Sequence, residues 1–313
     1  MKKILITGAS GFVGQHLTSL IENDYQIVGL TQSQSLTDSK KVEYVTGDIL
    51  DTQFLEDLLE KYKPDVIVNL VGIAQTHHIE PELLFKINFF GVLNLFESVK
   101  KLKEKSGYSP KVLHISSSDV YGKTKNTEHI DEDAPFYPVN YYGVSKVAGD
   151  RLAYQYSQSQ NLNVAIFRPF PHTGPGQKKG FFVPDMVSQL VNIEKNPEKK
   201  ELMVGNLDAV RDYLDVRDVV KVYASAIEKE FQNGEAFNIC SGKGVKIGDL
   251  LNKLVSFSSK KIKIVNDPER MRPSEVPTLV GDPSKVMKQF NFRPEIEINE
   301  TLKDSLDQWR RFN

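Results

Sequence analysis

The feature that most constrains the fold lies at the N-terminus, where a short apolar run meets a glycine-rich turn. Residues 3–7 are branched and apolar, as in a buried parallel strand. Gly8, Gly11 and Gly14 follow at three-residue intervals and open a helix that we expect to reach about residue 22. Such glycines let a pyrophosphate approach the backbone at the positive end of the helix. A tight turn without a ligand is the alternative, but the position after a strand favours nucleotide binding.

Strands and helices then alternate as far as residue 168. We expect further strands at residues 26–30, 42–46, 65–69, 111–115 and 163–168, and helices at 51–62, 82–104 and 140–159. Six βα units in sequence predict an α/β fold, a doubly wound parallel sheet with helices on both faces. The 82–104 helix carries more than one apolar stripe, which could be the seam of a homodimer or ordinary packing on the sheet.

The alternation of strands and helices stops after Arg168, where a Gly/Pro-rich loop breaks regular structure. Elements expected beyond it are helices near 181–194, 215–230, 246–257, 283–290 and 299–312, and strands near 201–206, 236–240 and 261–265. We predict a dinucleotide-binding domain at residues 1–168, with 207–240 returning to it. Residues 169–206 and 241–313 would form a smaller lobe over the carboxyl ends of the strands, where open sheets bind ligands.

Composition excludes several classes of function. The 313 residues carry a formal net charge of −1, which gives no general attraction to nucleic acid or an anionic membrane. The single cysteine, Cys240, excludes an intramolecular disulfide framework and a cysteine-rich metal site, and no metal is expected. Neither a secretory signal nor a run of 18 apolar residues is evident, so we expect a cytoplasmic protein that does not enter a membrane.

A tyrosine and a lysine in the 140–159 helix suggest proton chemistry. Tyr142 and Lys146 are four residues apart and therefore share one helix face. An ammonium beside the phenol would favour the phenolate, and a serine hydroxyl from the run at 116–118 could hold a carbonyl against it. Alone, this spacing more often marks an ordinary amphipathic face, but the serine run and the glycine turn favour the catalytic interpretation.

Several strand ends are placed to contact a dinucleotide. The strand ending near Thr31 carries neither the acid expected for NAD nor an arginine for a 2′-phosphate, so NADP is only slightly preferred over NAD. Asp48 is suited to contact the edge of an adenine ring, and Ile49 is suited to pack against its face. Asp48 could equally cap a helix. The candidate cofactor-binding residues are Gly8, Ser10, Gly11, Phe12, Val13, Gly14, Thr31, Asp48, Ile49, Leu70, Val71, Gly72, Tyr142, Lys146 and Phe170.

With the glycine turn, the serine run and Tyr142-x-x-x-Lys146 in this order, the chain resembles, end to end, the extended short-chain dehydrogenase/reductases that act on nucleotide sugars. The resemblance implies a Rossmann domain with a nicotinamide nucleotide and a C-terminal lobe that holds the sugar nucleotide. It makes Tyr142 the catalytic acid/base. It also implies that Lys146 contacts the nicotinamide ribose and lowers the pKa of Tyr142. Ser117 is the expected catalytic serine, with Ser118 as the alternative.

The second half is similar to the branch of that family that reduces GDP-4-dehydro-6-deoxy-D-mannose, in residues 168–177, 204–212, 215–218 and 270–277. This resemblance implies that Arg211 and Arg272 contact the diphosphate and Glu275 a ribose, although surface ion pairs would explain the same residues. The candidate substrate-binding residues are Ser117, Ser118, Asp119, His172, Lys178, Val204, Arg211, Arg272 and Glu275.

Two departures from the family pattern bear on the reaction. Relatives usually carry Asn at Pro171, and the dehydratase branch carries Glu at Asp119, which is one methylene shorter and so less able to reach the substrate. We therefore expect NAD(P)H-dependent reduction of the 4-keto group of the GDP-sugar. A 4-epimerase, a 4,6-dehydratase and a non-catalytic dinucleotide-binding regulator are the alternatives.

Overall fold

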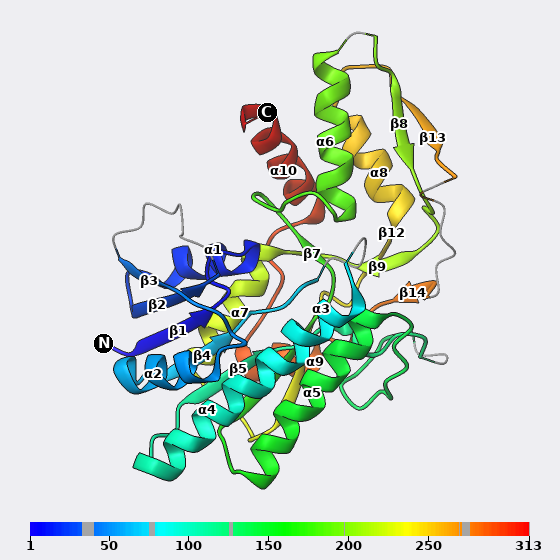
Figure 1. The fold of residues 1–313 in the computed structure, drawn as a ribbon. Coiled ribbons are helices and arrows are strands. Elements are labelled where there is room, and N and C mark those ends of the chain that lie inside the picture. The colour runs from blue at the N-terminus through cyan, green and yellow to red at the C-terminus, as the bar shows by residue number, and fades with distance from the viewer. Residues whose placement is uncertain are drawn as a thin grey trace.

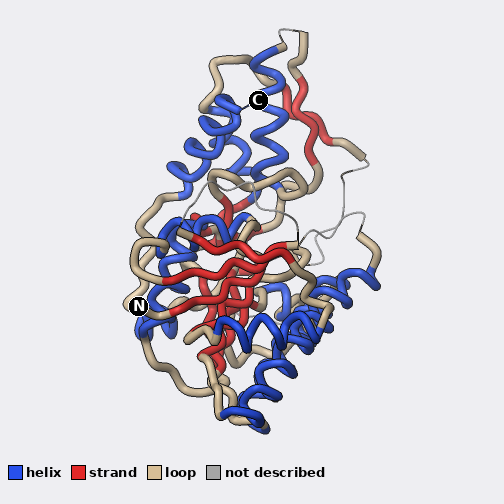
Figure 2. The backbone as a smooth tube through the Cα atoms, turned by 60° about the vertical axis from the view of Figure 1, so that its left-hand side comes forward, coloured by secondary structure: helices blue, strands red, loops and turns tan. Residues whose placement is uncertain are grey.

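A seven-stranded parallel sheet forms the centre of the molecule (Figures 1 and 2). The computed structural model describes residues 1–32, 41–74, 79–124, 128–196, 198–268, 270 and 276–312. The strands of this sheet are β1 (Lys3–Thr7), β2 (Gln26–Thr31), β3 (Val42–Thr46), β4 (Val66–Asn69), β5 (Lys111–Ile115), β6 (Val164–Pro169) and β11 (Glu235–Ile239). Their order is β11-β6-β5-β4-β1-β2-β3. Successive strands are therefore added toward one edge of the sheet from β1 to β3 and toward the other edge from β4 onward, with the switch between β1 and β4. The predicted doubly wound α/β fold is confirmed, and this switch point is where such sheets bind ligands.

Helices cover both faces because the strands are apolar on both sides. On one face lie α1 (Phe12–Ile21) and α7 (Val216–Glu228), which bury Leu17, Ile21 and Tyr223 against the sheet. On the other lie α2 (Thr52–Tyr62), α4 (Gly91–Ser106) and α5 (Tyr141–Ser159), with Leu95 and Phe96 in the core. The two helical layers hold the strand ends in fixed positions.

The single helix predicted over residues 82–104 is interrupted. It consists of α3 (Pro81–Phe85), a π-helical turn at Lys86–Phe90 and α4. Inside this turn, buried Asn88 accepts from the Ile73 N–H at 2.8 Å and donates to the Ile73 carbonyl and to Ser145 Oγ, both at 3.0 Å. Since π turns often occur at functional sites, this interruption directs attention to the loop after β4.

The C-terminal lobe stands above the carboxyl ends of the strands (Figure 1). Its core joins α6 (Phe182–Lys195), α8 (Ile247–Ser256) and α10 (Ile298–Phe312) to the parallel pair β8 (Glu201–Val204) and β13 (Lys263–Asn266). Short strands connect the lobe to the sheet. They are β7 (His172–Thr173), β9 (Val210–Asp212), β10 (Leu214–Asp215), β12 (Gly244–Lys246) and β14 (Thr278–Leu279).

One helix lies elsewhere than the sequence suggested. We assigned residues 241–313 to the lobe, but α9 (Ser284–Phe290) packs against the sheet domain. The reason is apolar contact, because the ring of Phe290 lies 4.9 Å from that of Phe237 and 5.7 Å from that of Phe167. None of the helices in the described ranges has the length and apolar character needed to cross a bilayer.

Candidate active site

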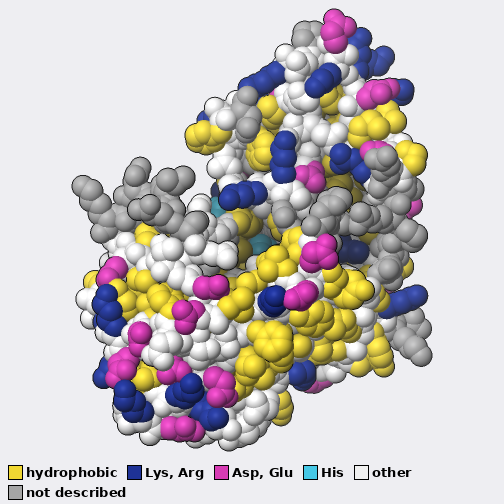
Figure 3. All heavy atoms as spheres, in the orientation of Figure 1, with side chains coloured by type: hydrophobic (Ala, Val, Ile, Leu, Met, Phe, Trp, Pro, Cys, Tyr) yellow, Lys and Arg dark blue, Asp and Glu magenta, His cyan; other side chains and the backbone are white. Residues whose placement is uncertain are grey.

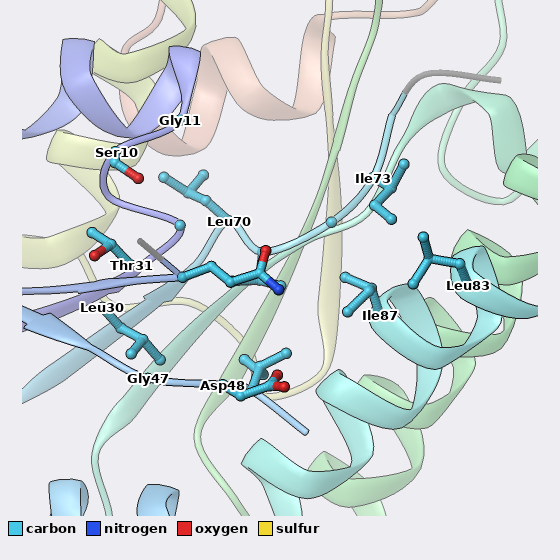
Figure 4. Close-up of a pocket in the computed structure, with 15 residues that line it drawn as sticks. Ser10, Gly11, Leu30, Thr31, Gly47, Asp48, Leu70, Ile73, Leu83 and Ile87 are labelled. Carbon is cyan, nitrogen blue, oxygen red and sulfur yellow. The ribbon is translucent and has the colours of Figure 1, made fainter. Parts of the chain in front are cut away.

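The glycine turn opens onto a cavity of about 330 Å³ at the switch point of the sheet. Figure 4 shows Ser10 and Thr31 on one side of this cavity, and Ile73, Leu83 and Ile87 on the other. Leu70, Val71, Gly72, Asp48 and Ile49 also line it, and all of these except Ile73, Leu83 and Ile87 were expected from the sequence. Leu30, Gln32 and Gly47 line it as well and were not among the expected residues.

The turn itself fits a dinucleotide. Gly8 has φ +70°, and a Cβ on Gly14 would lie 2.7 Å from the Ala9 carbonyl oxygen, so neither position accepts a side chain without a shift. No side chain caps α1 at Gly11, which leaves the first helical N–H groups directed at the cavity. These groups would bind a pyrophosphate. Asp48 is exposed at the rim of the cavity, where its Oδ1 accepts a hydrogen bond from the Leu50 N–H. The cap of α2 is Asp51 rather than Asp48.

A second cavity, of about 460 Å³, continues from the first between the sheet and the C-terminal lobe. The two cavities share Gly8, Gly11, Leu70 and Gly72. The second is lined by the expected site residues Phe12, Val13, Gly14, Ser117, Ser118, Asp119, Tyr142, Phe170 and His172. Elements far apart in the chain therefore meet at one opening, next to the turn that fits a dinucleotide.

Tyr142 lies half-buried at the start of α5 and shares a hydrogen bond with Ser117. Asn140 caps the helix by accepting from the Gly143 N–H at 2.7 Å, which fixes where α5 begins. Burial raises the pKa of Tyr142 well above its ordinary value. The Asp119 carboxylate acts in the same direction, and the bond with Ser117 opposes them. The phenol is therefore protonated at neutral pH.

We expected Lys146 to lower the pKa of Tyr142, but in this structure burial raises that pKa. The Lys146 ammonium donates to the Ile115 carbonyl at 2.8 Å and lies 3.3 Å from where a Cβ on Gly72 would stand. Burial lowers the pKa of Lys146 to about 8, against the opposing effect of Asp150. The lysine is thus held under the dinucleotide cavity, a place compatible with the expected contact to a ribose.

A buried histidine lies behind this lysine. His114 on β5 receives a hydrogen bond at Nδ1 from Asn69 (3.3 Å), and no partner in the described ranges reaches its Nε2. Burial lowers the pKa of His114 to about 3, the Lys146 ammonium adds to the effect, and Asp150 opposes it. The imidazole is therefore neutral at physiological pH.

The substrate candidates divide into those that reach the second cavity and those that do not. Ser117, Ser118, Asp119 and His172 line it. Arg211 on β9 does not line it itself but interacts electrostatically with Asp119. Val204 is fully buried in the core of the lobe, so its side chain does not reach the cavity. Lys178 is exposed and lines a small hollow on the outer side of its loop, with Trp309. Arg272 and Glu275 fall outside the described residues.

Other residues of this cavity were not among the candidates named one by one, although the sequence pointed to the loop at residues 177–182. Tyr213, Phe181, Phe182 and Gln177 line it, and the Gln177 amide oxygen accepts from Thr173 at 2.7 Å. Gln177 precedes the candidate Lys178 by one residue. The direction of the loop alone turns Gln177 toward the cavity and Lys178 away from it. Tyr213 follows Arg211 by two along an extended segment, a spacing that places both side chains on one face.

Fold and site together define a class. A parallel sheet with a glycine turn at its switch point and a Tyr-x-x-x-Lys helix beside it is the architecture of the short-chain dehydrogenase/reductases, which bind NAD(P). Residues 5–305 match the family model described as GDP-mannose 4,6 dehydratase. The chain belongs to this family, within the NAD(P)-dependent oxidoreductases of nucleotide sugars.

Individual relatives are similar over nearly their whole length. The GDP-6-deoxy-D-mannose reductase of Pseudomonas aeruginosa is 33% identical, over 98% of this chain and 97% of the relative. The GDP-6-deoxy-D-talose 4-dehydrogenase of Aggregatibacter actinomycetemcomitans is 31% identical, over 91% and 90%. The solved structure of RMD from Pseudomonas aeruginosa complexed with NADPH matches with a TM-score of 0.85 at 29% identity, over 99% of both chains.

Proposed function

We propose that this protein reduces the 4-keto group of GDP-4-dehydro-6-deoxy-D-mannose to give GDP-6-deoxy-D-mannose (GDP-D-rhamnose). The observation that carries the proposal is the meeting of Ser117 and Tyr142 at the opening shared by the glycine turn and the C-terminal lobe. The reductase of Pseudomonas aeruginosa, 33% identical over almost the whole chain, supports the choice of substrate.

The chain's own residues bind the ketone and supply the proton. A reduced nicotinamide, when bound, supplies the hydride for the ketone carbon. Ser117 holds the carbonyl oxygen, and Tyr142 donates its proton to that oxygen. At neutral pH the phenol is in the protonated form that a donor needs, and its raised pKa makes it a weaker acid than a free tyrosine. Lys146, fixed by the Ile115 carbonyl, holds the nicotinamide ribose.

Arg211 binds the diphosphate in this proposal. Arg211 is half-buried and interacts electrostatically with Asp119, which lines the second cavity. Burial lowers the pKa of Arg211, while the Asp119 carboxylate raises it. Within the described ranges the hydrogen bonds of this side chain use Nη1 alone, which donates to the carbonyls of Val210 and Pro277. The remaining N–H groups of the guanidinium have the planar, forked geometry that binds two oxygens of a phosphate.

NADPH is the cofactor we favour, with NADH as the alternative. Thr31 ends β2 at the first cavity, and its uncharged hydroxyl tolerates a 2′-phosphate where an acid would repel it. The Pseudomonas structure complexed with NADPH supports the same choice.

The experiment is to incubate the purified protein with the keto sugar nucleotide and either NADPH or NADH, and to follow the loss of nicotinamide absorbance. NMR of the product gives the configuration at C4. Tyr142→Phe should lower kcat by about a hundredfold or more and leave the Kd for NADPH within about twofold. Tyr141→Phe is the matched control, since Tyr141 is 62% exposed. No oxidation of either cofactor by the wild type would refute the proposal.

The rival 4-epimerase and 4,6-dehydratase reactions consume no reduced cofactor overall. The dehydratase is disfavoured because Asp119 has a shorter reach than the glutamate of that branch. If GDP-mannose lost water, or a C4 epimer formed without cofactor consumption, the corresponding rival would replace the reductase.

We also propose that the protein is a homodimer. Large apolar side chains gather over α3, α4 and α5 (Figure 3), where Leu83, Phe90, Tyr141, Val144 and Tyr154 are 41–62% exposed. The apolar stripe on residues 82–104 continues onto α5 and so forms one exposed helical face. We propose that a second copy of the chain covers this face. Light scattering after gel filtration measures the mass, and Tyr154→Glu should shift a dimer toward monomer.

A further inference from the structure

The loop at residues 172–177, in the wall of the second cavity, is attached to the helix that begins at the glycine turn. The Nε2 atom of His16 on α1 lies 2.8 Å from the Pro175 carbonyl oxygen. Because a carbonyl can only accept, Nε2 carries the proton and donates it. The two residues are 159 positions apart in the chain, and both are half-buried. This hydrogen bond therefore joins α1 directly to the loop.

A contact between two rings joins the same helix and loop one helical turn earlier. Phe12 precedes His16 by four residues and so shares its helix face. The Phe12 ring is stacked on the His172 ring, with centroids 6.4 Å apart and planes 7° apart, and it meets the His16 ring edge-on at 5.3 Å. Phe12 and His172 both line the second cavity. Helix α1 thus holds the loop at two points, and one of them is part of the cavity wall.

The loop is closed on itself and is also attached to the C-terminal lobe. The Thr173 hydroxyl donates to the Gln177 amide oxygen at 2.7 Å, across the turn. The Gly176 N–H donates to the Gln308 side chain on α10. A shift of Pro175 would therefore move Gln177, which lines the second cavity, along with it.

Helix α1 consequently faces both ligand sites. Its first N–H groups are directed at the first cavity, where a pyrophosphate would bind, and its side chains hold the loop of the second. We propose that His16 is a positioning residue that couples the two sites. With a dinucleotide at the start of α1, the hydrogen bond to Pro175 holds the loop in the conformation that binds the GDP-sugar.

The inference rests on the proposed function and adds a residue that lines neither cavity. No bond is made or broken at His16. Because linkage between two binding sites is reciprocal, the GDP-sugar tightens the binding of the dinucleotide by the same factor.

The test measures binding instead of turnover. Calorimetry gives the Kd for GDP without NADP+ and with saturating NADP+, and the ratio of these two values is the coupling factor. GDP is the nucleotide of the proposed substrate, and it does not react with NADP+.

Four proteins are compared, namely the wild type, His16→Phe, His16→Gln and His129→Phe. His129 is the matched control, because its Nε2 also lies next to a backbone carbonyl, that of Gly242 at 2.9 Å. Unlike His16, this histidine is exposed and lies away from both cavities.

NADP+ should tighten the binding of GDP to the wild type by about fivefold or more, as for a typical coupling between two sites. His16→Phe keeps a ring against Phe12 but removes the donor, so the coupling factor should fall about threefold or more, as for one lost hydrogen bond. His16→Gln carries an amide N–H that can replace Nε2 and should recover part of the loss. His129→Phe should keep the wild-type factor.

Two results overturn the inference and leave the reductase function standing. One is a coupling factor near one in the wild type. The other is an equal loss of GDP affinity with and without NADP+ in His16→Phe, which would make His16 a structural contact only. If the wild type shows coupling that His16→Phe loses, but oxidises neither NADPH nor NADH with the keto sugar, the proposed function fails and the coupling stands. If GDP does not bind to the wild type, both fail.

Discussion

The buried ion pair between α5 and β6 should be among the most sensitive points of the fold. Arg168 is 2% exposed and Asp150 is fully buried, and the guanidinium holds the carboxylate through Nε at 2.9 Å and Nη2 at 3.2 Å. Nη1 also donates to Tyr121 Oη and the Glu132 carbonyl. Burial opposes ionisation of Asp150, but attraction and hydrogen bonds from Arg168 hold its pKa below the usual range.

Asp150→Asn removes one charge and leaves Arg168 buried without its counter-ion. Breaking a buried pair in this way costs about 3–5 kcal/mol, a large part of the roughly 5–15 kcal/mol by which a typical domain is stable. Replacing both partners, as in Asp150→Leu with Arg168→Met, should recover at least half of the loss, because no charge is then stranded.

Urea unfolding followed by far-UV circular dichroism measures the free energy of unfolding of each variant. The exposed Asp133→Asn control should stay within about 0.5 kcal/mol of the wild type. A loss below about 1 kcal/mol in Asp150→Asn, or a double variant less stable than the single one, would refute the reasoning. Because Asp150 lies on the helix of Tyr142 and Lys146, the single variant should also lower kcat at temperatures where it remains folded.

Three further predictions concern the nucleotide site and acid stability. Asn88→Ala removes the hydrogen bonds to the Ile73 backbone and to Ser145. The Kd for NADPH, measured by calorimetry, should therefore rise about tenfold or more. An unchanged Kd would contradict a role of Asn88 in holding the loop after β4. Gly14→Ala should abolish NADPH binding, because its Cβ would collide with the turn, and wild-type affinity would show that the turn can move. The pKa of His114 is lowered to about 3 in the folded state, so the unfolded state alone takes up this proton as pH falls below about 6.5. The stability held by neutral His114 is therefore complete above pH 6.5 and is lost progressively toward pH 3, by up to about 1.4 kcal/mol per pH unit. Urea unfolding of His114→Leu should show a shallower loss between these pH values, and equal slopes would exclude the histidine as the cause.

The sequence predicted the sheet and its main helices because each element repeats its apolar residues at a fixed period. It missed the π turn at Lys86–Phe90, since a helical period does not reveal one inserted residue. The signal was Asn88, a polar residue inside an apolar helix, whose partners at Ile73 and Ser145 only the folded chain brings close.

Site residues on the regular strand and helix ends were the more predictable ones. Ser117 and Tyr142 meet because a parallel strand ends, and the helix that follows it begins, at the same edge of the sheet. Lys178 and Val204 do not line the second cavity, because the direction of a side chain in an irregular loop or on a short strand depends on what packs against it.

The sequence by itself determined the parallel sheet, the glycine turn and the residue types of the site, because strand period, backbone freedom and side-chain chemistry are local properties. Only the tertiary structure decided the charge states. Burial keeps Tyr142 protonated, and a carbonyl of β5 takes the ammonium of Lys146 that we had expected to lower the pKa of the phenol. The pKa of a side chain depends on desolvation and on neighbours from other elements, and these exist only once the chain has folded.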